Sequence, residues 1–256
     1  LITSSRRSPI SYPDRGGAYQ YFDQVGVIRN MSKWSVVIPS AARIPELMRM
    51  ALRVCWEGRP GVVHVDVPEN IVNGDAEEVS HIPPQRYRRR YAASPAPDAL
   101  DEAAKLLSEA RLPMIHAGSG VLSEQDPLAW SMVHIKANNS LRNAADLVLC
   151  LGSRMGETDW WGKQPYWASP DAQKLIQVDL EEEVIGRNRP ADLGIVADIK
   201  SFLRLLIDRL GEGTKEPFQL ESRRREVEKL AAETEKTRKE LDRKLEDRST
   251  PMLTGH

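Results

Sequence analysis

The sequence predicts an α/β protein with parallel, doubly wound sheets. Short β-branched or apolar runs follow helical patterns within a few residues, which is typical of parallel α/β sheets. Several of these runs end in glycine or aspartate, where a strand turns into a helix. This alternation of helix and strand patterns occurs once before and once after a proline-rich stretch, so we expect two successive α/β parts rather than one.

Composition excludes several classes of protein. The 256 residues contain 41% hydrophobic side chains, and 36 Lys and Arg nearly balance 37 Asp and Glu. A net charge of −1 argues against a nucleic-acid or membrane-surface partner. No apolar run approaches the roughly 18 residues of a membrane span, and no basic and apolar leader opens the chain. Cys55 and Cys150 lie in apolar runs and are expected to be buried, reduced thiols, so we expect a cytoplasmic protein.

The stretch GRPGVVHVDVPENI, residues 58–71, carries the strongest local pattern. A helix is predicted from Pro45 and ends before Gly58, because proline suits a first turn and glycine a position just past a helix. The strand 62–67 follows at once, and a second short strand is predicted at 34–39. Buried valines explain most of the strand but not the polar pair His64 and Asp66 within it.

Composition also suggests the domain boundaries. Residues 76–97 have no sustained period and include several prolines and the run RYRRRY, which predicts a linker. The arginines favour a solvated face or an interdomain contact over a phosphate site. The α/β rhythm resumes over 98–211, and 212–256 predicts a charged amphipathic helix and a further linker. Residues 1–75 form the first domain part.

The second α/β part is predicted element by element. Asp98 is expected to cap its first helix. The following strands and helices are expected at LPMIHAGSG, ANNSLRNAA, DLVLCLGSR, KLIQVDL, GIVAD and IKSFLRLLIDRL. After AGSGV the pattern requires a crossover helix and another strand, which the sequence does not supply. Either the domain has lost one unit, or residues are absent between Leu122 and Ser123.

Glycines and carboxylates follow the strands of this second part, where ligands of open α/β sheets bind. Exposed glycine amides can bind phosphate, Arg154 could pair with a diphosphate, and an aspartate could accept bonds from a ribose. The alternative is that any parallel sheet needs glycine where strands turn into helices. The candidate nucleotide-site residues are Gly118, Ser119, Gly120, Gly152, Ser153, Arg154, Asp179 and Asp198.

Other candidate groups point less clearly to chemistry. His64 and His116 lie inside predicted strands, and a satisfied core or interface histidine is favoured over a catalytic base. No metal-binding, P-loop or nucleophile-elbow motif is present. The aromatic run TDWWGKQPYW, residues 158–167, either covers a ligand or subunit contact or is anchored in its own core.

Several of these stretches together resemble one family. GRPGVVHVDVPENI is similar to the end of the pyrimidine-binding domain of thiamin-diphosphate-dependent enzymes of the acetolactate synthase type. AYQYFDQVGVIRNMSKWS resembles the segment of that family with the form Ala-aromatic-Gln-Glu. Three further stretches resemble the central domain of that family: LPMIHAGSGV, AADLVLCLGSR and IQVDLEEEVIGRNRPADLGIVADIKSFL. STPMLTGH resembles the approach to the third domain.

The resemblance implies the tail of a pyrimidine-binding domain, followed by a Rossmann-like central domain. It implies thiamin diphosphate and Mg²⁺, held mainly by a glutamate before residue 1 and a Gly-Asp-Gly motif after residue 256. FAD or ADP is a further possible ligand of the central domain. Tyr21 stands where many family members have glutamate, and Val184 stands where the FAD-using members have it. In those members, the unit that is missing after Leu122 carries the loop that holds FAD. We therefore expect no flavin.

The resemblance also implies the activity and its site. It implies a carboligase or decarboxylase acting on a small 2-keto acid, in a homodimer or homotetramer, with no nucleic acid or membrane partner. Tyr19 and Gln20 are assigned to the edge of the active site at the subunit interface. The central-domain nucleotide pocket is assigned Gly118, Ser119, Gly120, Gly152, Ser153, Arg154, Ile185 and Asp198. The alternatives are a decarboxylase or hydrolase with another substrate, or a non-catalytic nucleotide-binding module.

Overall fold

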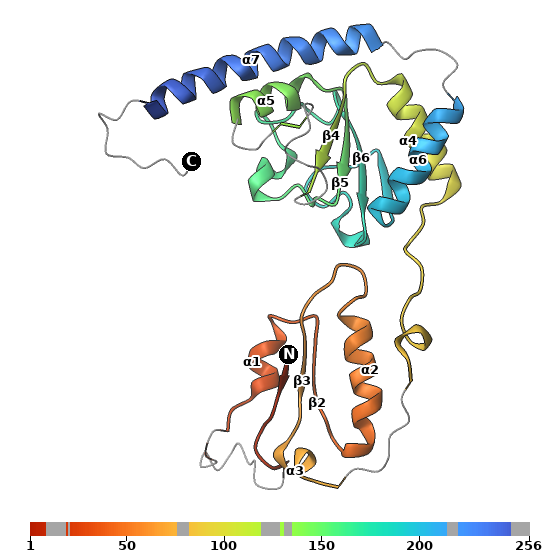
Figure 1. The fold of residues 1–256 in the computed structure, drawn as a ribbon, viewed down its shortest axis with the longest axis vertical. Coiled ribbons are helices and arrows are strands. Elements are labelled where there is room, and N and C mark those ends of the chain that lie inside the picture. The colour runs from red at the N-terminus through yellow and green to blue at the C-terminus, as the bar shows by residue number, and fades with distance from the viewer. Residues whose placement is uncertain are drawn as a thin grey trace. The chain divides into compact units, whose positions relative to one another are not determined.

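The computed structural model describes residues 1–8, 19, 21–75, 82–118, 129–130, 135–213 and 220–246. The chain forms two compact units, residues 1–91 and residues 92–256. Each unit is described by itself below, with the helix and strand labels of Figure 1.

Unit 1 contains a parallel sheet of three strands in the order β1-β3-β2. The strand β3 is central, so the GRPGVVHVDVPENI stretch supplies the strand that pairs on both sides. Its strands and helices are β1 (Ile2–Thr3), α1 (Gln24–Arg29), β2 (Trp34–Val37), η3 (Ala41–Arg43), α2 (Ile44–Val54), β3 (Val63–Asp66), α3 (Glu69–Val72) and η4 (Pro84–Arg86).

The two faces of this sheet differ in polarity. Side chains alternate between faces along a strand, so Val63 and Val65 share one face and His64 and Asp66 the other. The valine face packs against α2, whose Leu47 and Ala51 are buried with Ile38 and Val65 in one apolar cluster. Helix α1 contacts β2 and β3 but buries none of its own residues.

Unit 2 contains a parallel sheet of four strands in the order β4-β5-β6-β7. Each strand is the neighbour of the one before it in the sequence. The elements are α4 (Pro97–Glu109), β4 (Pro113–Ala117), α5 (Ile135–Ala144), β5 (Leu147–Leu151), η5 (Glu157–Gly162), β6 (Lys174–Asp179), η6 (Glu182–Val184), β7 (Leu193–Val196), α6 (Ile199–Gly213) and α7 (Leu220–Glu246).

Helices cover both faces of the second sheet. Strand β5 is buried along its whole length, because its alternate side chains enter two separate cores. Leu147, Leu149 and Leu151 pack with α4 and α6, including Phe202, and Figure 1 shows these two helices together on one side. Val148 and Cys150 pack on the other side with Leu141 of α5 and with Trp167.

The charged helix α7 belongs to unit 2 and contacts α5. Its predicted apolar seam is confirmed at Leu230, which is buried. Near its start, the Arg223 guanidinium donates to the carbonyl oxygens of Leu107, Ser108 and Ala110, at the end of α4. These carbonyls have no partner within α4, so a cation at a helix C-terminus fixes α7 there.

The predicted α/β class with parallel, doubly wound sheets is confirmed, but three local predictions were wrong. Asp98 does not cap α4, which begins at Pro97 after Ala96; Asp98 lies in the first turn. Proline takes the first position because it needs no amide partner there. Cys55 is half-buried rather than buried, since it ends α2 near the surface. The predicted strand 62–67 is shorter, because Val62 is exposed and outside the ladder.

Two further predictions concern the chain break after Leu122 and the domain boundaries. The break expected between Leu122 and Ser123 lies outside the described residues, as do Ser119 and Gly120. The change of unit at residues 91 and 92 falls within the predicted linker 76–97. The other domain boundaries stay predictions.

Candidate functional site

A row of polar side chains covers the second face of the unit 1 sheet. The parallel register pairs Ser35 with His64 and Thr3 with Asp66. His64 and Asp66 are almost fully buried. Polar groups buried in this way require hydrogen-bond partners, and the neighbouring strands supply them.

The hydrogen bonds of this row form one continuous chain, the Ser35–Asp66 relay (Ser35, His64, Thr3 and Asp66). Ser35 Oγ lies 2.7 Å from His64 Nδ1, and Thr3 Oγ1 lies 2.8 Å from His64 Nε2. The Thr3 hydroxyl donates to Asp66 Oδ1 over 2.8 Å. A hydroxyl has one proton to donate, so Thr3 must accept from Nε2–H. In a neutral ring, which burial favours by lowering the pKa, Nδ1 is the acceptor and Ser35 donates to it.

The prediction that a strand histidine is buried with its hydrogen bonds satisfied is confirmed for His64. Burial lowers the pKa of His64 from its ordinary 6.5, against the attraction of Asp66 and with a smaller contribution from the Leu1 amino group. The neutral ring is therefore the form that the fold accommodates.

This shift predicts that unit 1 loses stability in mild acid. An unfolded histidine takes up a proton near pH 6.5, whereas folded His64 resists protonation to a lower pH. The contribution of His64 is thus complete above about pH 6.5 and is lost as the pH falls towards the folded pKa. Urea unfolding between pH 8 and pH 5 measures it. Replacing His64 by glutamine should flatten the slope, and an equal slope in that variant would contradict the assignment.

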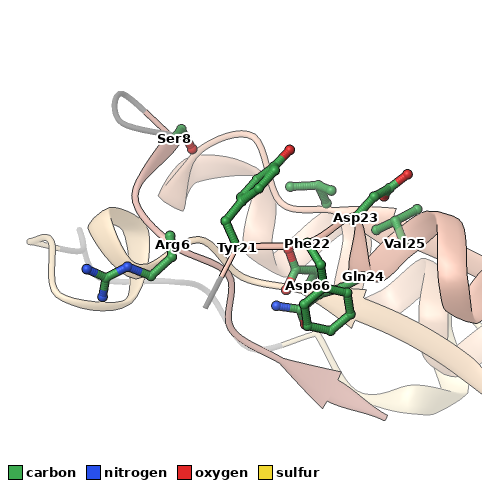
Figure 2. Close-up of a pocket in the computed structure, with 9 residues that line it drawn as sticks. Arg6, Ser8, Tyr21, Phe22, Asp23, Gln24, Val25 and Asp66 are labelled. Carbon is green, nitrogen blue, oxygen red and sulfur yellow. The ribbon is translucent and has the colours of Figure 1, made fainter. Parts of the chain in front are cut away.

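A pocket of about 240 Å³ opens at the carboxyl ends of the same strands. Asp66 ends β3, and Val37 ends β2. The other lining residues come from the chain after β1 and from the start of α1, as Figure 2 shows. They are Arg6, Ser8, Tyr21, Phe22, Asp23, Gln24 and Val25. In an open α/β sheet this edge is where ligands bind.

The charged groups of the pocket are mostly engaged with neighbours. Arg6 forms an ion pair with Glu69, with 3.2 Å between Nη1 and Oε2. Asp23 accepts a bond from the Gly26 amide and so caps α1. Asp66 uses Oδ1 for Thr3, and among the described residues no hydrogen bond is recorded for its second oxygen. Asp66 is therefore the carboxylate of this pocket with acceptor capacity left.

The resemblance assigned Tyr19 and Gln20 to an active-site edge. Tyr19 is exposed, and Gln20 lies outside the described residues. The next two residues, Tyr21 and Phe22, line the unit 1 pocket. Their position is compatible with the assignment, which stays a prediction.

The predicted nucleotide-site residues of unit 2 follow the strands of the second sheet at one edge. Gly118 follows β4, Gly152 follows β5, and Asp198 comes just after β7. The amide of Gly118 donates to the Leu151 carbonyl and that of Gly152 to the Val178 carbonyl. These two amides, expected to face a phosphate, are therefore engaged within the sheet edge.

Three more of the predicted residues, Asp198, Ser153 and Ile185, have structural partners. Asp198 accepts a bond from the Ser201 amide and so caps α6. Ser153 donates to Asp159, and its carbonyl accepts from Gln177. Ile185 is half-buried and closely approaches Gly194, whereas Arg154 is exposed. The structure thus gathers these residues at one edge and shows a folding role for most of them.

Gly118 is expected to tolerate no side chain. A Cβ there would lie 2.4 Å from the Gly152 carbonyl oxygen, which is fixed in the sheet edge. Gly118→Ala should therefore lower the free energy of unfolding by about 1–3 kcal/mol. Gly211 in α6 is the control, because its Cβ would meet nothing within 4 Å. Gly211→Ala should stabilise by roughly 0.5–1 kcal/mol, and equal effects in a urea titration would contradict the clash.

A buried polar cluster around Asp159 was not predicted. Asp159 Oδ2 lies 3.2 Å from both His116 Nε2 and Ser153 Oγ, and Oδ1 lies 3.3 Å from Arg142 Nη2. The Asp159 carbonyl accepts from the Trp167 indole over 2.8 Å. The signal in the sequence was a carboxylate inside the aromatic run TDWWGKQPYW, which is unusual for a solvated loop.

Electrostatics fix the charge state of this cluster. Burial opposes ionisation of Asp159, but the hydrogen bond and charge of His116, with Arg142 and Ser153, hold its pKa below the ordinary 3.8. Burial, reinforced by Asp159, raises the pKa of the Cys150 thiol to about 12. The predicted reduced, inert state of Cys150 fits this shift.

The aromatic run is anchored in its own core, which was one of its two predicted roles. Trp167 is fully buried against His116 and under Arg142. Trp160 stacks on Tyr166, with 4.1 Å between ring centroids. Trp160 and Trp161 adopt left-handed backbone angles and stay 40% and 43% exposed. A ligand or subunit contact at these two rings stays a prediction.

Among the described residues, no group of three or more His, Cys, Asp or Glu side chains is arranged to hold a metal ion. No helix in the described part of the chain has the length and apolar character to cross a membrane.

Comparison with known proteins gives a consistent family. Residues 119–206 match the model of the thiamine pyrophosphate enzyme central domain. A probable acetolactate synthase large subunit of Methanocaldococcus jannaschii is 29% identical over 227 residues, covering 74% of this chain and 38% of that protein. A sulfoacetaldehyde acetyltransferase of Rhodobacter capsulatus is 30% identical over 235 residues, covering 76% and 38%.

A third relative, a glyoxylate carboligase of Escherichia coli O157:H7, is 25% identical over 225 residues, covering 74% of this chain and 37% of that protein. The chain thus spans little more than a third of the length of these relatives. Together the matches show that the chain carries the central domain of thiamine pyrophosphate enzymes and is a relative of acetolactate synthase large subunits.

Proposed function

We propose that the intact protein is a thiamin-diphosphate-dependent carboligase or decarboxylase acting on a small 2-keto acid. The observation that carries the proposal is the pocket at the carboxyl edge of unit 1. It is lined by Tyr21 and Phe22, directly after the two residues that the resemblance assigns to the active-site edge. Relatives named for acetolactate synthesis and glyoxylate carboligation support this class of reaction.

In that reaction, the cofactor would supply the chemistry, and residues of unit 1 would position the substrate and exclude water. Thiamin diphosphate, when bound, supplies the electron sink for cleavage of a carbon–carbon bond beside a carbonyl. Among the described residues, no group of three or more His, Cys, Asp or Glu side chains is arranged to hold Mg²⁺. Tyr21 and Phe22 would exclude water from the reacting groups, and Gln24 and Asp66 would orient polar atoms of the substrate.

The direct test is turnover by the intact protein with thiamin diphosphate, Mg²⁺ and either pyruvate or glyoxylate. We expect release of carbon dioxide that depends on added thiamin diphosphate. Product analysis by proton NMR separates a ligated hydroxy-keto acid from a free aldehyde, and so a carboligase from a decarboxylase. No thiamin-dependent consumption across a panel of 2-keto acids would overturn the proposal and favour a non-catalytic nucleotide-binding module.

Gln20 is expected to support catalysis and not folding. The resemblance places its amide at the mouth of the active site, where it would bond to a substrate carboxylate or a developing oxyanion. Losing one such bond costs about 1–3 kcal/mol, so Gln20→Ala should lower kcat/KM by roughly 5- to 150-fold at an unchanged Tm. An earlier melting transition with intact activity per folded molecule would make Gln20 structural.

We also propose a homodimer or homotetramer in which unit 1 meets a second copy. Exposed apolar side chains support this: Phe22 before α1, Val27 within it and Met31 after it are each more than half exposed. Light scattering of the intact protein tests the oligomer. A monomer at micromolar concentration, where activity is measured, would contradict it.

A further inference from the structure

We propose that the Ser35–Asp66 relay conducts a proton to the unit 1 pocket, with Asp66 as the donor to the reacting groups. The inference rests on the proposed function, because it assigns a role in that reaction. With a neutral Nε2–H imidazole, the hydrogen bonds of the relay run from Ser35 to His64, from His64 to Thr3 and from Thr3 to Asp66.

The proposed reaction requires a proton by charge balance. A 2-keto acid anion that loses carbon dioxide leaves the remaining fragment with one electron pair and one negative charge. A decarboxylase must protonate that fragment to give an aldehyde. A carboligase transfers the charge to the acceptor's oxygen and must protonate that oxygen. Either way, one proton enters the pocket in each turnover, and the pocket needs a donor.

The relay can supply that proton with all bonds balanced. Thr3 passes its hydroxyl proton to Asp66, Thr3 takes the Nε2 proton of His64, and Nδ1 takes the hydroxyl proton of Ser35. A proton from water restores Ser35. The net result is one proton gained by Asp66, one taken from water, and His64 changed from the Nε2–H to the Nδ1–H tautomer. After Asp66 has protonated the substrate, the resting tautomer returns when Nδ1 loses its proton to water through Ser35 and Nε2 gains one from pocket water through Thr3; rotation of the two hydroxyls then completes the reset.

The pattern of burial suits proton transfer along the relay, because the middle is shielded from water and the two ends are accessible. His64 is 0% exposed, so a proton reaches its ring through its two hydroxyl partners. Ser35 is half-buried and is the end that takes a proton from water. Asp66 lines the pocket and keeps one carboxylate oxygen without a recorded partner among the described residues. The lowered pKa of His64 keeps the ring neutral at rest.

Among the described residues, the charged groups near the relay come from β1, from the segments that follow β1 and β3, and from the start of α1. On β1 the Leu1 amino group bonds to the Val63 carbonyl and contributes to the pKa of His64. Arg6 and Glu69 form an ion pair beside the pocket, and Asp23 caps α1. The residues of β2, Trp34–Val37, carry no charge. The His64 imidazole, whose pKa is lowered by burial, is the titratable group at the centre of the relay.

The alternative is that the row only satisfies buried polar atoms. Both readings predict some loss of stability when a member is removed, so a melting temperature does not distinguish them. They differ in what kcat, its pH dependence and the histidine tautomer do when the relay is cut at Thr3 and then restored.

The first measurement concerns the relay itself and does not require activity. Nitrogen-15 NMR of the histidine-labelled chain should show His64 as a neutral Nε2–H tautomer at pH 7. Thr3→Ser should keep that spectrum, because the hydroxyl is retained. A resting Nδ1–H tautomer, or a doubly protonated ring at pH 7, would overturn the relay whatever the protein catalyses.

The second measurement concerns its use, with pyruvate as the probe in the intact protein. Thr3→Val keeps the side-chain shape but removes the hydroxyl, and should lower kcat roughly 100-fold with KM unchanged, since general acids contribute on the order of 10² or more. Thr3→Ser should restore kcat. Asp66→Asn should match Thr3→Val, and the double variant should lose no more than either alone.

The outcomes separate this inference from the proposed function. An active wild type in which Thr3→Val keeps its kcat and pH profile would refute the relay alone. An inactive wild type with the expected His64 tautomer would refute the proposed function and the catalytic use of the relay with it.

Discussion

Asp159→Ala is expected to lower the free energy of unfolding of unit 2 by about 3–5 kcal/mol, the cost of removing one partner from a buried ion pair. Asp159 is 7% exposed, and its carboxylate is the partner of both Arg142 and His116. Without it, a buried guanidinium remains whose own pKa is already lowered by burial. Urea unfolding followed by circular dichroism measures the loss.

Asp101 provides the matched control. It pairs with Arg209 on the surface at 3.4 Å, where ion pairs contribute about 0–1 kcal/mol. Asp101→Ala should therefore change stability by less than about 1 kcal/mol. Equal losses in the two variants would show that Asp159 does not organise the cluster.

Trp167→Ala is expected to cost about 3–5 kcal/mol, as for other buried aromatic residues. Trp167 is fully buried, and its indole N–H donates to the Asp159 carbonyl. Its ring packs against the imidazole of His116 and under the guanidinium of Arg142. Its removal leaves a cavity and an unpaired carbonyl in the same place. The same urea titration measures the loss.

Trp161 is the control for Trp167, because it lies six residues earlier and is 43% exposed. Trp161→Ala should change stability far less. Because Asp159 and Trp167 share contacts, the double variant should lose less than the sum of the single losses. Strict additivity would contradict the idea that they form one cluster.

The sequence by itself determined the fold class and the order of most elements. Period-2 and helical patterns report which face of an element is buried, and that is a local property of the chain. The strand through Val63 and Val65 and the all-apolar β5 therefore form as these patterns predict. Helix ends depend on single cap contacts, and here Asp98 was misassigned.

Only the tertiary structure decided which polar residues meet. His64 gains its partners from β1 and β2, 61 and 29 residues away in the chain. Asp159 gains Arg142 and His116 from α5 and β4. Strand pairing and sheet order bring such residues together, and neither is encoded in local periodicity. The polar pair inside the valine strand, anomalous in the sequence, thus becomes the centre of a hydrogen-bonded row once the neighbouring strands are in place.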